Sequence, residues 1–133
     1  MLIDSNIIIY AVQPENDWLR HFIKQHTPAV SAISYVEVLG YHRLTPLERT
    51  YFSTFFTAAT MLELTATVLN QAVQLRQTRK MTLGDALVAS TALVYQRTLV
   101  TRNIKDFHWI PQLTLLNPFS QDTNPTPLDT EKN

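Results

Sequence analysis

Short apolar segments alternate with longer helix-like segments along this sequence, and this alternation constrains the fold more than any other feature. The segments MLID, PAVS, TMLEL, TLVT and LTLL are each typical of a short buried strand. Between them lie stretches with apolar residues at helical spacing, for example Val68, Leu69, Ala72 and Leu75. Strands separated by helices favour a parallel sheet that is covered on both faces. We therefore expect an α/β fold with a mostly parallel central sheet of about five strands, flanked by helices on both faces.

Capping residues indicate where two of the helices start, and composition indicates where the domain ends. Thr45, Pro46 and Glu48 form the pattern of an N-cap, a first-turn proline and a capping-box partner. Asn16 is a candidate N-cap for the segment DWLRHFIKQH. The segment NPFSQDTNPTPLDTEKN at the C-terminus is polar and contains several prolines. We expect one domain over residues 1–119 and a mobile tail over residues 120–133.

Composition excludes several classes of protein. The chain has no cysteine, so disulfides, thiolate metal sites and cysteine nucleophiles are excluded. Its only glycines, Gly40 and Gly84, are too few for a dinucleotide-binding fingerprint or a phosphate-binding P-loop. No basic leader precedes MLIDSN, and no stretch is long and apolar enough to span a bilayer. We expect a soluble cytoplasmic protein with no membrane partner.

Positive charge is concentrated in one part of a chain that is neutral overall. Eleven Lys and Arg balance eleven Asp and Glu. Between Arg76 and Lys105, however, six cations face the single acid Asp85, a local charge of +5. This segment could follow a phosphate backbone, or its cations could simply be solvated helix ends.

Four acidic residues are expected to meet at one edge of the predicted sheet. Right-handed crossovers bring the carboxyl ends of parallel strands to the same edge, where open α/β sheets bind their ligands. Asp4 ends the first strand and Asp106 lies in the turn after the fourth. Glu37 falls in the helix after PAVS, and Asp85 lies near the start of the LGDALVAS helix.

Each of these acids also has an ordinary structural explanation. Asp4 could cap the helix that follows it, and Glu37 could pair with Ser34 in a capping box. Asp85 could favour a helix N-terminus through the dipole, and Asp106 could form an Asx-turn. Their coincidence at one edge favours a shared site.

A cluster of four carboxylates needs a cation to offset its mutual repulsion. An all-oxygen cluster without cysteine or paired histidines suits a hard ion, Mg²⁺ or Mn²⁺. Such an ion can activate water against a phosphodiester, so the reaction needs no protein nucleophile.

Four segments carry a resemblance to a known family. LIDSNIIIYA, VSAISYVEVLGY, LGDALVASTAL and LVTRNIKDF resemble, in order and spacing, the four acidic motifs of PIN-domain nucleases. The resemblance is closest to the VapC-type toxins of bacterial toxin–antitoxin modules, and it covers the chain up to the tail. It implies a single PIN-like domain and a metal-dependent endoribonuclease with Mg²⁺ or Mn²⁺ as cofactor. The implied catalytic and metal-binding residues are Asp4, Glu37, Asp85 and Asp106.

The resemblance also implies roles for these acids and their neighbours. Asp4 and Asp106 would be direct ligands of one or two ions, and Glu37 and Asp85 would complete the site directly or through water. Ser5 and Thr101 match small hydroxyl positions beside the metal, and Asn103 matches a polar position that orients the site. The family implies a homodimeric toxin held inactive by a small antitoxin that docks over the active-site groove.

The sequence therefore predicts an endoribonuclease that hydrolyses RNA with metal-activated water. Arg102 and Lys105 would hold substrate phosphates beside Asp106, although both could be solvated turn cations. The alternative is a catalytically silent PIN scaffold that binds an antitoxin-like partner, which the complete set of four acids disfavours. A receiver-like switch is disfavoured because DSN, rather than an acidic pair, follows the first strand. A haloacid-dehalogenase-type phosphatase is disfavoured because Asn6 stands where Asp-x-Asp needs its second acid.

Overall fold

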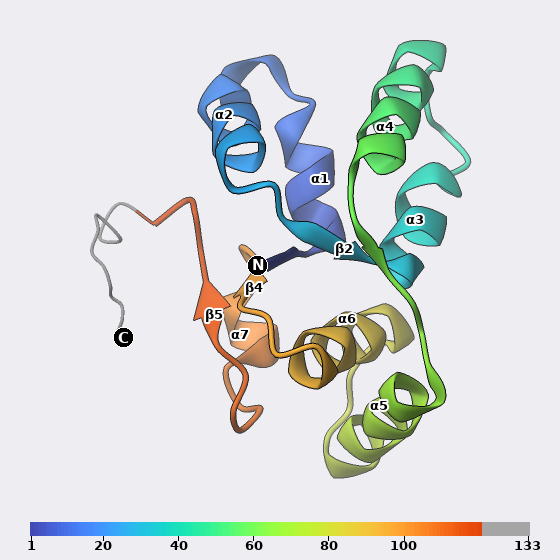
Figure 1. Cartoon of the computed structure of the whole chain (residues 1–133), viewed down its shortest axis with the longest axis vertical. Helices are drawn as coiled ribbons and strands as arrows, with labels where there is room; N and C mark the ends of the chain where they lie inside the picture. The colour runs from blue at the N-terminus through green and yellow to red at the C-terminus, as the bar shows by residue number, and fades with distance from the viewer. Residues whose placement is uncertain (121–133) are drawn as a thin grey trace.

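The computed structural model describes residues 1–120 (Figure 1). The strands of this part are short: β1 (Leu2–Ile3), β2 (Ala29–Ser31), β3 (Met61–Leu62), β4 (Leu99–Val100) and β5 (Leu115–Leu116). The helices are α1 (Ser5–Ala11), the 3-10 helix η1 (Pro14–Asn16), α2 (Asp17–His26), α3 (Ala32–Leu39), α4 (Pro46–Ala58), α5 (Ala66–Thr78), α6 (Leu83–Val94) and α7 (Ile104–Phe107). None of the helices in this part of the chain is long and apolar enough to cross a membrane.

The sheet is parallel throughout the described chain and has the strand order β3-β2-β1-β4-β5. β1 lies at its centre, with Ile3 opposite Val30 on one side and opposite Val100 on the other. The strand signals in the sequence therefore predict the sheet correctly. Its order could not be predicted, because neighbouring strands such as β1 and β4 are far apart along the chain.

Alternate residues of the strands supply two separate hydrophobic cores. Ile3, Val30 and Val100 pack with side chains from α1, α2, α3 and α4. Leu2 and Leu99, one position earlier, pack with α5, α6 and α7 on the opposite face. Figure 1 shows the corresponding layers, with α1 to α4 above the sheet and α5 to α7 below it. This arrangement follows from the two-residue period of a strand, which sends successive side chains to opposite faces.

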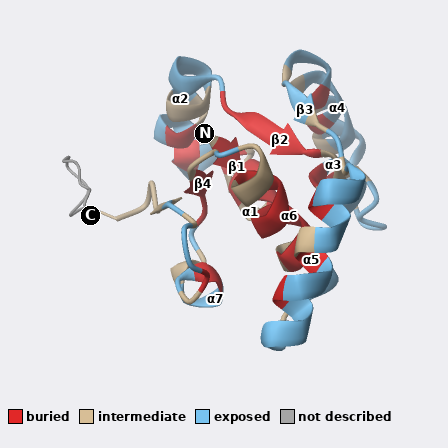
Figure 2. Ribbon diagram, turned by 60° about the horizontal axis from the view of Figure 1, so that its bottom comes forward, coloured by how far each residue is buried: buried red, intermediate tan, exposed pale blue. Residues whose placement is uncertain are grey.

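α6 is the buried helix of the lower layer. Its residues 86–92 are all buried, and Figure 2 shows it deep within the molecule beside the more exposed α5. A helix apolar on most sides needs such a position, since any solvated face would expose large apolar surface. The burial of α6 fixes the place of its N-terminal turn, which carries Asp85.

Of the two helix starts, one is confirmed in full and the other only in position. Thr45 Oγ1 accepts from Glu48 N at 3.1 Å, and Thr45 N donates to Glu48 Oε1 at 3.0 Å, so the predicted capping box is present. Asn16 is the residue before α2, but its side chain does not cap that helix. Its amide instead donates to the Tyr10 carbonyl at 2.9 Å, because η1 turns the residue back toward α1.

The described chain stays attached to the domain as far as its final residues. Phe119 packs edge-on against Tyr10 at 5.4 Å and Trp18 at 5.0 Å between ring centroids. The C-terminal segment up to this ring is therefore held against α1 and α2. The mobile tail predicted for residues 120–133 lies, after Ser120, outside the described residues.

Candidate active site

Asp4 lies at the carboxyl end of the central strand, and its side chain points across to β4. Asp4 N donates to the Val100 carbonyl at 2.9 Å, continuing the pairing of β1 with β4. The Asp4 carboxylate accepts a hydrogen bond from Thr101 Oγ1 at 2.8 Å. Asp4 occupies the N-cap position of α1, but its side chain makes no capping bond. The capping explanation for this acid is therefore wrong.

Thr101 connects the carboxyl end of β1 to the turn that precedes α7. Its side chain is fully buried, and its hydroxyl accepts a hydrogen bond from Asn103 N at 3.0 Å while donating to Asp4. Asn103 precedes α7, and its side chain does not cap that helix. Thr101 thus ties the end of β1 to the turn between β4 and α7, with Asn103 contributing its backbone amide.

Glu37 is held by the hydroxyl group of Ser5, from α1. Ser5 Oγ lies 2.7 Å from Glu37 Oε1 and 2.8 Å from Ser34 Oγ. Ser5 has a single hydroxyl proton, and an ionised carboxylate is the stronger acceptor. We therefore assign the Ser5 proton to Glu37. The capping-box explanation is wrong for Glu37, because the N-cap of α3 is Ser31.

Gly84 brings the first turn of α6 against Glu37. A Cβ atom at this position would overlap the Glu37 carboxylate, so only glycine allows the observed approach. Thr82 caps the same turn by accepting from Asp85 N at 3.1 Å. The cap and the glycine together place Asp85 beside Glu37.

The four acids are electrostatically coupled. Burial raises the pKa of Asp4 to about 6, against the lowering effect of the Thr101 hydrogen bond, and the charges of Asp85 and Glu37 raise it further. Burial also raises the pKa of Asp85, and the charges of Asp106 and Glu37 add to this effect. The pKa values of Asp4 and Asp85 are thus both raised by neighbouring carboxylates, as expected for a shared site.

Within residues 1–120, no Lys, Arg or His side chain forms an ion pair with these carboxylates. The ion pairs of this region both involve Asp17, with Arg20 and His21 as partners. The same region contains no group of three or more His, Cys, Asp or Glu side chains gathered closely enough to hold a metal ion. The oxygen-only donors and their unbalanced charge fit Mg²⁺, which usually keeps several waters and takes only one or two carboxylates from a protein.

Asp106 lies on a short helix, which corrects the turn predicted for it. It sits in α7, and its backbone carbonyl accepts a hydrogen bond from Trp109 Nε1 at 3.0 Å. The Asx-turn explanation is therefore wrong. Asp106 and Asp85 line one cleft of about 610 Å³, together with Lys105 and Trp109.

The two cations predicted to bind substrate have different surroundings. The Arg102 guanidinium lies 4.2 Å from the ring centroid of Phe119 and 5.1 Å from that of Tyr10. Lys105 is exposed at the rim beside Asp106. The sequence does not single out Phe119 or Trp109 as neighbours of the site, because Phe119 meets Arg102 and Trp109 meets Arg79 only through contacts between separate segments of the chain.

Comparisons with known proteins identify the family and the fold. The family model of the PIN domain matches residues 1–110. VapBC2 from Rickettsia felis, bound to a promoter DNA fragment, has a TM-score of 0.76 at 24% identity, over 87% of this chain and 96% of that one. DNA-bound VapBC from Salmonella typhimurium has a TM-score of 0.76 at 17% identity, over 86% and 95% of the two chains. A toxin–antitoxin complex from Klebsiella pneumoniae has a TM-score of 0.68 at 26% identity, over 89% and 97%.

A search of curated protein sequences gives no significant match. The PIN domain match nevertheless spans most of the chain, and the parallel sheet is shared with the VapBC structures over nearly their whole length. The chain therefore belongs to the PIN domain family.

Proposed function

We propose that this protein is an endoribonuclease that depends on Mg²⁺ or Mn²⁺ and hydrolyses RNA phosphodiesters. One observation carries the proposal: neighbouring carboxylates that form no ion pair within residues 1–120 lie at the carboxyl edge of a PIN-family sheet. Charge repulsion in such a cluster costs folding free energy unless a cation binds. A catalytic role therefore explains the cluster better than a role in stabilising the fold.

The proposed ion is held by Asp4 and Asp106, with Glu37 and Asp85 contributing directly or through water. A divalent ion bound there supplies a water molecule of lowered pKa and stabilises negative charge on the phosphate. The protein's own contribution is positioning. Thr101 holds the Asp4 carboxylate, and Ser5 holds that of Glu37.

We further propose that this nuclease is the toxin of a toxin–antitoxin pair and acts in the cytoplasm. The Klebsiella pneumoniae neighbour is described as a toxin–antitoxin complex, and the other two neighbours are VapBC structures. Exposed apolar side chains on α3, on its connection to α4 and in the first turn of α4 offer a surface for a protein partner, namely Tyr35, Val36, Tyr41 and Leu47. A small antitoxin and a second copy of this chain are the expected partners.

The second candidate is a PIN scaffold that binds an antitoxin-like partner without catalysis. The apolar surface on α3 would serve it equally well, but a scaffold has no use for carboxylates that repel each other. Metal binding separates the two candidates, because a scaffold gains nothing from an ion. Mn²⁺ should raise the Tm of the nuclease and leave that of Asp4→Asn unchanged.

The direct test is cleavage of a mixed, folded RNA by the purified protein with Mg²⁺, with Mn²⁺ and with EDTA. The proposal requires cleavage with metal and none with EDTA. Metal-dependent cleavage that survives in Asp4→Asn would point to a contaminant. If Mn²⁺ raises the Tm but no RNA is cut, the substrate is narrower than the RNA supplied. If Mn²⁺ does not raise the Tm and no RNA is cut, the scaffold candidate is the correct one.

A further inference from the structure

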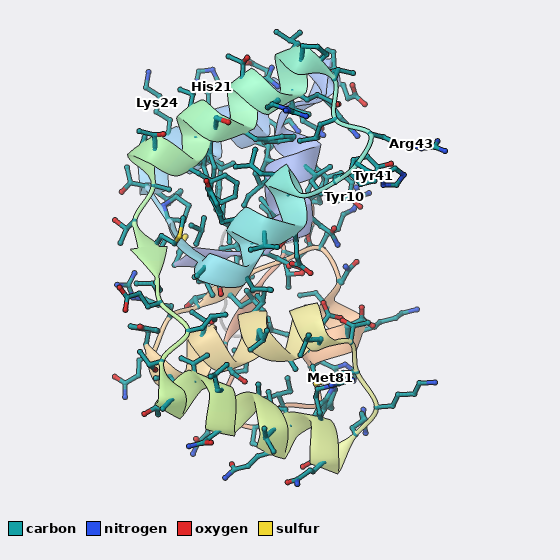
Figure 3. All side chains as sticks on the ribbon, turned by 90° about the vertical axis from the view of Figure 1, so that its right-hand side faces the viewer. Tyr10, His21, Lys24, Tyr41, Arg43 and Met81 are labelled. Carbon is teal, nitrogen blue, oxygen red and sulfur yellow. The ribbon has the colours of Figure 1, made fainter. Side chains whose placement is uncertain are left out.

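A cleft opens on the lower side of the candidate active site, between the α5–α6 connection and α7. It has a volume of about 610 Å³, within the usual range for ligand pockets, and the carboxylates of Asp85 and Asp106 line it. In Figure 3, Met81, which also lines the cleft, marks the α5–α6 connection below the layer that carries Tyr10 and Tyr41. The cleft therefore extends away from the carboxylates toward the end of α5.

Cations from two separate elements converge on this cleft. Arg76, Arg79 and Lys80 come from the end of α5 and the connection after it, and Lys105 comes from α7. Within residues 1–120, none of these four side chains forms an ion pair with a carboxylate. Apart from the two candidate catalytic acids, the charged residues of the lining are all positive. Such a surface attracts a polyanion and guides it toward the acids.

An aromatic side chain lies among these cations. The Trp109 indole donates to the Asp106 carbonyl at 3.0 Å, which fixes the orientation of the ring next to the candidate site. The Arg79 guanidinium lies over the same ring, 4.9 Å from its centroid. An indole ring and a planar guanidinium are both groups on which an unpaired nucleobase can stack.

Arg76 holds the connection in place. Its Nε donates to the Met81 carbonyl at 3.3 Å, which joins the last turn of α5 to the residues just before α6. Arg79 and Lys80 lie on the chain between these two points. Their positions relative to Asp85 are therefore set by the same contacts that set the start of α6.

We infer that this cleft binds a single-stranded segment of RNA, with phosphates on Arg79, Lys80 and Lys105 and one base stacked on Trp109 and Arg79. The inference rests on the proposed function and gives the RNA a path away from the scissile phosphate. Duplex RNA is disfavoured, because a paired base cannot leave its stack to reach the indole.

The test measures binding of a labelled single-stranded RNA of mixed sequence by fluorescence anisotropy in EDTA, at several salt concentrations. Arg79→Gln/Lys80→Gln should weaken binding at low salt by about tenfold or more. It should also flatten the slope of log K against log[salt] by about 1.4, since each phosphate contact on a single strand contributes about 0.7. Lys24→Gln/Arg43→Gln is the matched control, because it removes the same charge from exposed sites in the other layer (Figure 3).

Trp109 variants test the stacking step separately. Trp109→Leu should weaken binding by about tenfold, within the range for loss of one base stack, without changing the salt slope. The Trp109 ring packs partly against the core below the sheet, so its loss could also destabilise the fold. Trp109→Phe is therefore a second variant, which keeps an aromatic ring in this position. In a Trp18→Phe background, bound RNA should quench the remaining tryptophan fluorescence.

Two results would overturn this inference and are distinguishable from each other. If the wild-type protein cleaves RNA but the Arg79/Lys80 and Trp109 variants bind RNA as the control does, and bound RNA leaves the Trp109 fluorescence of the Trp18→Phe protein unchanged, the strand takes another path and the nuclease proposal stands. If the wild-type protein neither binds nor cleaves RNA and Mn²⁺ does not raise its Tm, the proposed function fails together with the cleft.

Discussion

The hydroxyl of Thr101 donates a 2.8 Å hydrogen bond to Asp4 Oδ2, joining residues that are 97 positions apart in the sequence. The bond forms where the central strand and its neighbour β4 end side by side. The order of the strands in the sheet thus brings Asp4 and Thr101 together in the candidate site.

Loss of the Thr101 hydroxyl should cost both stability and activity. Thr101→Val leaves the buried Asp4 carboxylate and the Asn103 amide without this partner, at a cost of about 1–3 kcal/mol in the free energy of unfolding. RNA cleavage should fall because Asp4 is no longer held. Urea unfolding and cleavage rates measure the two effects. Thr101→Ser, which keeps the hydroxyl, is the control, and equal stability and activity of the two variants would contradict the assigned role.

The raised pKa of Asp4 predicts a specific dependence of stability on pH. Folding raises this pKa from 3.8 to about 6, so between these values the folded state binds a proton that the unfolded state has lost. Stability should therefore fall as pH rises through this window and level off above it. Relative to Asp4→Asn, the wild type should lose up to about 3 kcal/mol between pH 4 and pH 7, measured by urea unfolding in EDTA. A difference that stays constant with pH would show that the Asp4 pKa is not raised.

The close approach of Gly84 to Glu37 predicts that Gly84→Ala stabilises the protein less in the wild type than in a Glu37→Ala background. Replacing glycine by alanine inside a helix normally stabilises it by about 1 kcal/mol. In the wild type, Gly84→Ala should gain less than this and should reduce cleavage, because the added Cβ displaces the Glu37 carboxylate from Ser5. In Glu37→Ala the same substitution should stabilise the protein. Equal effects on unfolding in the two backgrounds would mean that the residues do not interact.

Phe119 should stabilise the domain and fix the position of Arg102. Phe119→Ala removes ring contacts with Tyr10 and Trp18 and the stacking of the Arg102 guanidinium. Since the ring is only half-buried, we expect a loss of about 2 kcal/mol, less than for a fully buried phenylalanine. Thermal unfolding measures the loss, with Phe119→Tyr as the control that keeps the ring. A Tm unchanged in Phe119→Ala would show that the segment after β5 is not held by this ring.

The sequence predicts the sheet and the elements that carry the acids because these depend on local patterns. The strand segments, the capping box at Thr45 and the buried α6 all follow from apolar spacing or short-range hydrogen bonds. The positions of Asp4 and Asp85 then follow from the rule that parallel strands end at a common edge.

Features that depend on contacts between distant segments could not be predicted in this way. The sequence gives no sign that Asn16 turns its amide to Tyr10, or that Arg102 lies against Phe119. The helix α7 was also missed, because IKDF is a four-residue segment stabilised by its packing rather than by its own propensity.

The most direct test of the central claim compares cleavage of one RNA by single variants of the four acids. Asp4→Asn, Glu37→Gln, Asp85→Asn and Asp106→Asn should each lose most of the Mg²⁺- or Mn²⁺-dependent activity while remaining folded by circular dichroism. Asp17→Asn, which removes an exposed acid outside the site, should keep the wild-type rate. Full activity in the folded variants of the four acids would contradict the claim that these carboxylates form the active site.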